Sequence, residues 1–516
     1  MARFATLPAL PAVSSPHGIG RSPNSARTAQ GGSGYIPSDA HAELFRAAVG
    51  GLLTDGFYES SDARIARLIG LVPQCDPAWL RDFIPWLRSE ALMRSAPIVL
   101  AAEYAAAKMP DARTVVNMAM QRADEPGEML GYWMSRHGRN IPSRVKRGIS
   151  DACARLYTEV AALRYDGAGR PWRFGDVLEV VHAKPTNEAQ SALYKFLLDR
   201  RRHQPTAHPG LLPKMSRTLM VEALPAGERT PERLAAILED RDVVMSWERV
   251  AGWLNGPMTA AAWEAVIPTM GYFALLRNLN NFDRAGISKR ARDQVAFRLV
   301  EDVRGSKVLP FRLLTAYSAL EADTYRVALA DAADQAMVNL PWFKGRTLIM
   351  VDCSGSMGES LGGKSRFPLS RSRVAGFLAE SLARRCDEAI IAPYDTALHS
   401  LGEPQHHVGV LRAASDQRYA PRGGTATWRC MEQALVFAKN PDRVIVITDE
   451  QTSDSDTLPS TLPIITWNIA GYQAAHADHG ARNRFYVAGY SDAVMQTLPS
   501  AIAHGATGRW PWEVGA

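Results

Sequence analysis

The sequence predicts a mainly α-helical protein that ends in an α/β domain. From about Asp39 to Leu340, apolar residues recur at i, i+3, i+4 and i+7, which is the period of amphipathic helices. After "LPWFKG" the pattern changes to short β-rich runs that alternate with helical segments, as in a doubly wound parallel sheet. The chain has 516 residues, enough for two or three domains.

The helical part reads as a series of short amphipathic segments separated by polar or Pro/Gly breaks. Examples are "DARIARLIGLV", "FGDVLEVVH" and "EAQSALYKFLLDRR". Roughly fifteen such helices without one dominant core indicate stacked antiparallel pairs, an α-solenoid. The sequence has no clean repeat, so a non-repetitive helical bundle stays open as the alternative.

The C-terminal part contains five candidate strands. They are "TLIMV" (347–351), "AIIAPY" (389–394), "RVIVIT" (443–448), "LPIITWNIA" (462–470) and "RFYVAGY" (484–490). Helical segments such as "RSRVAGFLAESLARR" and "TWRCMEQALVFAK" lie between them. In parallel sheets of this kind, ligand sites form at the carboxyl ends of the strands.

Composition indicates a globular protein of a reducing compartment. No apolar run reaches the roughly 18–20 residues of a membrane span. The five cysteines show no C-x-x-C spacing or Cys/His pairing, so we expect reduced thiols and neither a disulfide framework nor a zinc site. We therefore predict a cytoplasmic protein without membrane contact.

The net charge of +6 is unevenly placed along the chain. Residues 341–516 carry 17 Lys and Arg against 17 Asp and Glu, so the whole excess lies in residues 1–340. A basic excess in one domain is weak support for a polyanionic partner. Residues 1–38 lack Asp and Glu and are rich in Pro, Ser and Gly, which predicts a disordered, mildly basic tail rather than a transit peptide.

The stretch "LIMVDCSGSMGESLGGKS" (348–365) contains two overlapping motifs. Its second half, from Gly358 to Ser365, matches the G-x-x-x-x-G-K-[ST] pattern of a P-loop, and "VIVITDE" (444–450) resembles the acid-ended strand that accompanies one. A P-loop joins a strand directly to a helix, whereas here the strand ends well before Gly358 and Pro368 opposes a helix that starts at Lys364. We interpret the P-loop pattern as a chance match.

The first half of the stretch, D-x-S-x-S, indicates a divalent cation site. Asp352 ends a predicted strand, and Ser354 and Ser356 follow on the loop. Further oxygen ligands are expected from the ends of other strands, and Thr425 in "GGTAT" and Asp449 after "VIVIT" are the candidates, with Thr427 as a substitute for Thr425. Such hard oxygen donors suit Mg²⁺. Neither serine lies in a G-x-S-x-G elbow, which argues against an esterase.

This order of Asp, two Ser, Thr and Asp resembles the metal-ion-dependent adhesion site of von Willebrand factor A domains. The helical half resembles the Ro autoantigen family, whose helical part is the TROVE module. "PWRFGDVLEVVHAKP" and "MGYFALLRNLNNF" carry that resemblance together with "GGSGYIPSDAHAELFRAAVGGLLTDGFYES" and "RVKRGISDACARLY". The resemblance implies HEAT-like repeats closed into a ring, with the A domain bridging the ends.

The resemblance also implies a non-enzymatic RNA-binding protein. Ends of misfolded or single-stranded RNA would enter the ring, and small noncoding Y RNA would bind a basic outer surface. The implied role is RNA quality control or decay, with an exoribonuclease as a further protein partner and no role for DNA.

Residues with suitable chemistry for RNA lie at three places in the helical half. "SRHGRNIPSRVKRG" concentrates basic groups for phosphates, "RPWRFGDVLEVVHAK" combines an aromatic ring with cations, and "LLRNL" holds one arginine. The matching histidine of the family falls on His182, whereas Arg277 is either an RNA contact or a structural cap. The predicted RNA-binding residues are Arg136, Arg139, Arg144, Lys146, Arg147, Arg170, Trp172, His182, Lys184 and Arg277.

We therefore expect three segments: a disordered tail over 1–34, a TROVE-like helical domain over 35–342 and a von Willebrand A-like domain over 343–516. Two other functions stay open. One is a metal-dependent protein-interaction module without an RNA role, and the other is a P-loop nucleotide hydrolase.

Overall fold

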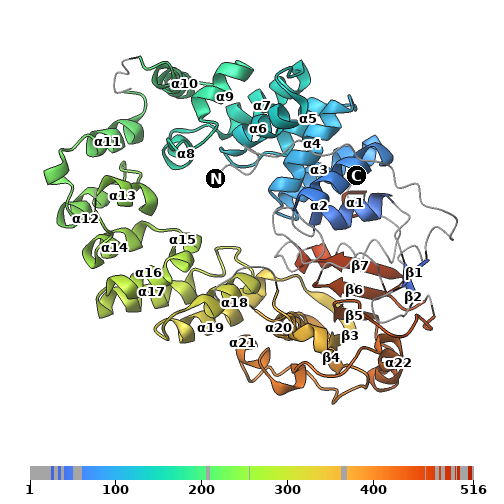
Figure 1. Cartoon of the computed structure of the whole chain (residues 1–516). Coiled ribbons are helices and arrows are strands. Elements are labelled where there is room, and N and C mark those ends of the chain that lie inside the picture. The colour runs from blue at the N-terminus through green and yellow to red at the C-terminus, as the bar shows by residue number, and fades with distance from the viewer. Residues whose placement is uncertain are drawn as a thin grey trace. The chain divides into compact units, whose positions relative to one another are not determined.

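A computed structural model provides the three-dimensional structure of the chain (Figure 1). It describes residues 25–27, 33–35, 40–49, 61–204, 210–254, 256–361, 369–459, 461–470, 476–477, 483–489, 494–495, 497–499 and 510–513. All but a few residues of the expected tail lie outside these ranges.

The described residues form two compact units. The helical unit comprises Asp76–Ser89 and Arg94–Phe297. The mixed unit comprises Arg298–Ala516, Glu90–Met93 and the described residues up to Cys75, so it holds the sheet and several helices. The expected fold class, a mainly helical chain with a C-terminal α/β part, is confirmed. The closed ring stays a prediction.

The helical unit is a succession of short helices that pack against near neighbours in the chain, such as α3 on α4, α5 on α7 and α9 on α10. This local packing is what stacked helical pairs require. The helices are α3 (Pro77–Ser89), α4 (Ser95–Ala106), α5 (Ala112–Met118), α6 (Glu125–His137), α7 (Ser143–Leu156), α8 (Glu159–Tyr165), α9 (Phe174–Val181), α10 (Glu188–Arg201), α11 (Pro213–Glu222), α12 (Pro231–Glu239), α13 (Trp247–Trp253), α14 (Ala260–Val266), α15 (Tyr272–Arg277), α16 (Leu279–Ala285) and α17 (Lys289–Glu301), whose last residues enter the mixed unit.

Local sequence explains where many of these helices begin. The side chains of Thr158, Asn187, Thr230 and Ser246 each accept a hydrogen bond from the backbone N–H three residues ahead, at the starts of α8, α10, α12 and α13. Such caps stabilise a helix by about 1 kcal/mol each. α4 is buried along nearly its whole length, which fits its apolar sequence "SAPIVLAAEYAA".

Besides the helices that follow β3 in the chain, the described part of the mixed unit contains α1 (Ala40–Val49), α2 (Ser61–Leu71), α18 (Pro310–Ala319) and α19 (Arg326–Gln335). α1 contacts the strand β7, and α19 contacts α21 (Val410–Ala413). There the Asp334 Oδ1 accepts a hydrogen bond from Val410 N at 2.8 Å. The change of sequence period near residue 342 therefore marks the first strand of the sheet, while the boundary in packing lies earlier in the chain.

Two short strands lie at the stretch that is expected to be a tail, and the disordered tail itself stays a prediction. β1 (Ser25–Arg27) and β2 (Ser33–Tyr35) pair antiparallel, with Ala26 opposite Gly34. Both strands are three residues long and pair through the backbone, so composition alone gave no sign of them.

The sheet consists of five parallel strands at the five predicted places. They are β3 (Phe343–Asp352), β4 (Cys386–Tyr394), β5 (Arg443–Thr448), β6 (Ile464–Asn468) and β7 (Arg484–Ala488), in the spatial order β4-β3-β5-β6-β7. The chain moves outward from β3 to β4 in one direction and from β5 onward in the other. The topological switch point therefore lies between β3 and β5, where doubly wound sheets bind their ligands.

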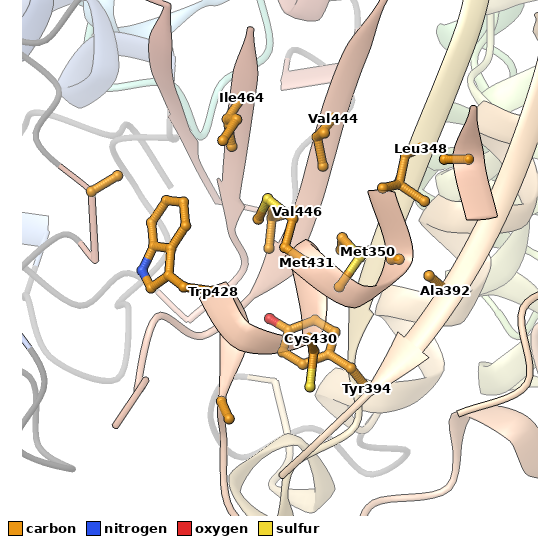
Figure 2. Packing of buried hydrophobic residues seen from close by; sticks show 14 residues of the cluster. Leu348, Met350, Ala392, Tyr394, Trp428, Cys430, Met431, Val444, Val446 and Ile464 are labelled. Atoms are coloured by element: carbon orange, nitrogen blue, oxygen red, sulfur yellow. The ribbon is translucent and has the colours of Figure 1, made fainter. Parts of the chain in front are cut away.

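Helices cover both faces of the sheet (Figure 1). α20 (Arg371–Ala383) contacts β3, β4 and β5, and α22 (Thr427–Ala438) contacts β3 and β4. Beneath α22, Leu348, Met350 and Val446 form one buried cluster with Trp428 and Met431 (Figure 2). Alternate residues of the same strands are buried on the other face, as a sheet covered on both sides requires.

Among the described residues, no helix has both the length and the apolar character to cross a membrane. All five cysteines are buried.

Candidate metal centre and basic helical surface

Asp352 ends β3 at the switch point and is fully buried. Its Oδ1 accepts a hydrogen bond from the backbone N–H of Ser354 at 2.8 Å, and its Oδ2 accepts one from the Thr448 hydroxyl at 2.6 Å. Burial and the Asp449 carboxylate raise the pKa of Asp352 to about 7. Two hydrogen bonds therefore fix the carboxylate in place.

The two serines of the D-x-S-x-S loop lie beside each other. The hydroxyls of Ser354 and Ser356 are 3.2 Å apart, and the short 3₁₀ turn η5 (Gly355–Gly358) carries the second of them. Cys353, which lies between Asp352 and Ser354 in the sequence, is fully buried, and burial raises the pKa of its thiol to about 12. A buried thiol with a raised pKa packs in the core rather than reacting as a thiolate.

Asp449 follows β5, the strand next to β3, and is also fully buried. Burial raises its pKa, while the Ser356 hydroxyl and Arg371 act in the opposite direction. Arg371 donates from Nη1 to Asp449 Oδ2 at 3.2 Å. The structure thus brings Asp352, Ser354, Ser356 and Asp449 to one end of two adjacent strands.

Thr425 is buried on a loop that is held against the other two. Ser453 donates to the Thr425 carbonyl oxygen from its backbone N–H at 2.9 Å and from its hydroxyl at 2.7 Å. Gly355 N donates to Gly423 O at 3.0 Å, which joins this loop to the D-x-S-x-S loop. Thr427, the substitute candidate, instead pairs its hydroxyl with that of Tyr394 at 3.2 Å, so the contacts favour Thr425.

The residues present fit a hard divalent cation. Two buried carboxylates and three hydroxyls from separate strand ends supply oxygen donors only, which is the donor set that a hard divalent cation prefers. Within the described part of the chain, no group of three or more His, Cys, Asp or Glu has an arrangement suited to a metal. A site here therefore depends on its serines and threonine.

The P-loop pattern does not have the surroundings that nucleotide binding needs. Ser360 pairs with Ser370 in an antiparallel bridge, and α20 begins only at Arg371. The glycine-rich stretch therefore does not run straight into a helix N-terminus. Lys364 lies outside the described residues.

Two residues near the site were not anticipated from the sequence. Thr448 holds the Asp352 carboxylate, and Arg371 holds that of Asp449. Thr448 directly precedes Asp449 in "VIVITDE", so its position at the strand end was a usable signal. Arg371 lies on a helix beyond the loop, and no spacing rule connects it to the motif.

The predicted RNA-binding residues divide into two groups. In the first, Arg139, Arg147, His182 and Lys184 are exposed, and Lys146 is partly exposed. Arg147 lies on α7, which packs against α9, and His182 directly follows α9 in a left-handed conformation, with φ of 53°. These side chains are available to a ligand at the surface of the helical unit.

The second group makes contacts within the fold, and one of its members, Arg136, is also exposed at the surface. Arg136 Nε lies 3.8 Å from Glu103 Oε1, Arg144 Nε donates to Ala105 O at 2.8 Å, and Arg170 Nη1 lies 3.3 Å from Asp124 Oδ2. Burial alone would raise the pKa of Asp124, but Arg122, Arg94 and Arg170 together hold it below its usual value.

Trp172 belongs to the same group, because it packs against α6. A Cβ added at Gly127 would lie 2.9 Å from Trp172 Cβ, and one added at Gly131 would lie 3.3 Å from the indole. The glycines therefore allow close packing of this ring on the helix, and Trp172 helps to fix the segment before α9.

Arg277 is exposed at the end of α15. Phe273, four residues earlier and so one turn away, is 50% exposed. A side chain that caps a neighbouring repeat would be covered, so the exposure favours the RNA-contact interpretation of Arg277 over the structural one.

The fold and the two surfaces define a class: a helical-repeat protein with a doubly wound α/β domain. Residues 244–359 match the family model of the TROVE domain. Among solved structures, the crystal structure of the Deinococcus radiodurans RO (RSR) protein is similar, with a TM-score of 0.67, 19% sequence identity, and coverage of 89% of this chain and 99% of that chain. No curated protein sequence matches the chain.

The TROVE match over residues 244–359 agrees with the predicted resemblance to the Ro autoantigen family, and the structural similarity shows a shared fold.

Proposed function

We propose that this protein binds small noncoding, Y-like RNA and the ends of misfolded or single-stranded RNA, as part of RNA quality control or decay in the cytoplasm. The observation that carries the proposal is the pair Phe273 and Arg277 on α15, inside the stretch that matches the TROVE domain. An exposed aromatic ring and an exposed guanidinium one turn apart offer a base a stacking surface and a phosphate a counter-charge.

A second basic surface supports contact with a larger RNA. Arg139, Arg147, His182 and Lys184 are exposed around α7 and α9. Their N–H donors and the charges of the arginines and the lysine suit phosphates without sequence preference, which is how a protein holds a folded RNA by its backbone.

We further propose that Asp352, Ser354, Ser356, Thr425 and Asp449 hold a divalent cation, Mg²⁺ by its preference for hard oxygen ligands. The bound cation would offer open coordination to an acidic group of a protein partner. An exoribonuclease is the partner class that an RNA-decay role favours.

The RNA proposal is tested with a fluorescent single-stranded RNA of about ten nucleotides, a length on the scale of single-stranded binding sites. We expect salt-sensitive binding to the full chain, and a loss of about 1–3 kcal/mol in the binding free energy on Phe273→Ala, the usual effect of removing a stacked ring. Arg277→Gln should weaken binding and flatten the salt dependence. Arg412→Gln, which changes an exposed arginine of the α/β part, is the matched control.

Two results would contradict the proposal: RNA binding that is absent at low salt, or binding that responds equally to Arg277→Gln and Arg412→Gln. With no RNA bound, the metal site alone would remain, and the protein would be a metal-dependent protein-interaction module.

A further inference from the structure

Arg371 is the most buried arginine of the described residues, with 1% of its side chain exposed. It begins α20, directly after the loop that follows the D-x-S-x-S motif. A buried guanidinium needs partners for its charge and its N–H groups, so its contacts show what it is there to hold.

Those contacts are with residues of the proposed metal site. Nη1 donates to Asp449 Oδ2 at 3.2 Å and to the Ser356 carbonyl oxygen at 3.2 Å. Nη2 lies 2.9 Å from Glu359 Oε2, a carboxylate whose side chain is 50% exposed. The guanidinium therefore lies between one buried acid of the site and one acid at the surface.

The charges of the site follow from this arrangement. Asp352 and Asp449 together contribute two negative charges when ionised, and the Arg371 guanidinium balances one of them. A divalent cation beside Asp449 and a guanidinium bonded to the same carboxylate repel each other strongly in a buried site. The two positive charges therefore compete for Asp449.

Glu359 provides a second carboxylate partner for the Arg371 guanidinium. The backbone N–H of Arg371 donates to the Glu359 carbonyl oxygen at 2.9 Å, so the two residues stay adjacent when the side chain moves. Rotation of the guanidinium away from Asp449 would leave it paired with Glu359, which is partly in water.

We propose that the Arg371 guanidinium competes with the divalent cation for the Asp449 carboxylate. When the cation binds, the guanidinium pairs with Glu359 instead. This inference rests on the proposed metal site. Arg371 thereby lowers the affinity of the site for the metal and keeps the buried carboxylates stable without one.

The test is a titration of the full chain with Mn²⁺, followed by the electron paramagnetic resonance signal of the free ion. Arg371→Gln should bind Mn²⁺ about tenfold more tightly or better, because one buried positive charge is gone. Glu359→Gln should bind it more weakly, because the guanidinium loses its second acceptor. Arg373→Gln removes a charge from the same helix without touching Asp449 and should stay within about twofold of the wild type, as expected of a more distant, screened charge.

Calorimetry of each variant without metal shows whether it is folded. Tighter binding by Arg371→Gln and weaker binding by Glu359→Gln support the proposal. Equal or weaker binding by a folded Arg371→Gln variant overturns it. If that variant does not fold, Glu359→Gln decides the matter, since unchanged binding in this half-exposed substitution also overturns the proposal.

The outcome for the metal site itself is separate. If the wild type binds Mn²⁺ and Asp352→Asn abolishes binding, the site stands even where the competition fails. If neither the wild type nor Arg371→Gln binds Mn²⁺, both the site and the competition are refuted.

Discussion

The switch point of the sheet and the surface of the helical unit both present charged residues to a ligand, but they do so in opposite ways. At the switch point, Asp352, Ser354 and Asp449 are buried and held by short hydrogen bonds at the ends of adjacent strands. On the helical unit, Arg139 and Arg147 are exposed. The first arrangement suits a small ion that fits one geometry, and the second suits a long polyanion.

Basic residues of one segment therefore have different roles: some stay exposed to a ligand, and others pair with an acid inside the fold. Arg170 and Arg147 come from neighbouring basic segments, yet Arg170 pairs with Asp124 whereas Arg147 is exposed. Experiments that separate stability from binding should therefore separate the two kinds of residue.

The largest effect is expected where charge is buried in the helical unit. Glu125 is fully buried, and its carboxylate accepts hydrogen bonds from Arg88 at 2.9 Å and from the backbone N–H of Gln121 at 2.6 Å. Glu125→Ala leaves the buried guanidinium of Arg88 without its acid and should lower the free energy of unfolding by about 3–5 kcal/mol. Calorimetry of the full chain measures the change.

The control for this prediction is the exposed pair of Arg113 and Asp151. Asp151→Asn should change stability by less than about 1 kcal/mol, because surface ion pairs contribute little. Equal losses in the two variants would show that burial does not distinguish the pairs.

A fall in pH should lower the stability of the α/β part through one buried histidine. His476 Nε2 lies 2.8 Å from the Thr466 hydroxyl, and the ring lies edge-on to Trp428. Burial lowers the pKa of His476 to about 4, with Arg484 acting in the same direction and Asp454 and Asp456 against it. The contribution to stability is therefore complete above the unfolded pKa near 6.5 and is lost as the pH falls toward 4.

The total loss from this one group is about 3 kcal/mol, since each pKa unit corresponds to about 1.4 kcal/mol. His476→Gln should flatten the dependence of stability on pH between 4 and 6.5, whereas His407→Gln, at an exposed position, should leave it unchanged. Parallel pH profiles for wild type and His476→Gln would contradict the assignment.

The metal site gives a prediction of intermediate size. Asp352→Asn keeps the shape of the side chain but removes the charge, so the rise in melting temperature that Mg²⁺ gives the wild type should disappear. At a concentration one hundred times the dissociation constant, that stabilisation is about 2.7 kcal/mol. Asp387→Asn, at the amino end of β4 and so at the opposite end of the sheet, is the control. An unchanged response to Mg²⁺ in Asp352→Asn would show that the ligand set is wrong.

The sequence predicted the five strands and the meeting of Asp352 with Asp449, because parallel strands end at one edge of a sheet and their buried residues form continuous apolar runs. It did not predict Arg371, whose approach to Asp449 depends on the tertiary position of α20.

The predicted RNA-binding residues were harder to judge from the sequence. A helical period tells which face is apolar, but it does not tell which polar residues find partners on other helices. From the sequence, Arg144, Trp172 and Arg147 were therefore equal candidates for RNA contact. In the structure, Arg144 donates to a backbone carbonyl and Trp172 packs on two glycines.

The smallest effect is expected for single basic residues. It distinguishes those that contact RNA from those that stabilise the fold. Arg147→Gln should weaken the binding of a structured RNA only severalfold, about 1 kcal/mol, and should leave the melting temperature unchanged, because Arg147 is exposed. Arg170→Gln should do the reverse, since it removes a partner of the buried Asp124 and so lowers the melting temperature more than it weakens RNA binding. Binding isotherms at several salt concentrations and melting curves of both variants measure the two effects separately. If both variants lost RNA affinity to the same extent with no change in stability, the contact of Arg170 with Asp124 would not matter to the fold, and the two residues would belong to one RNA-binding surface.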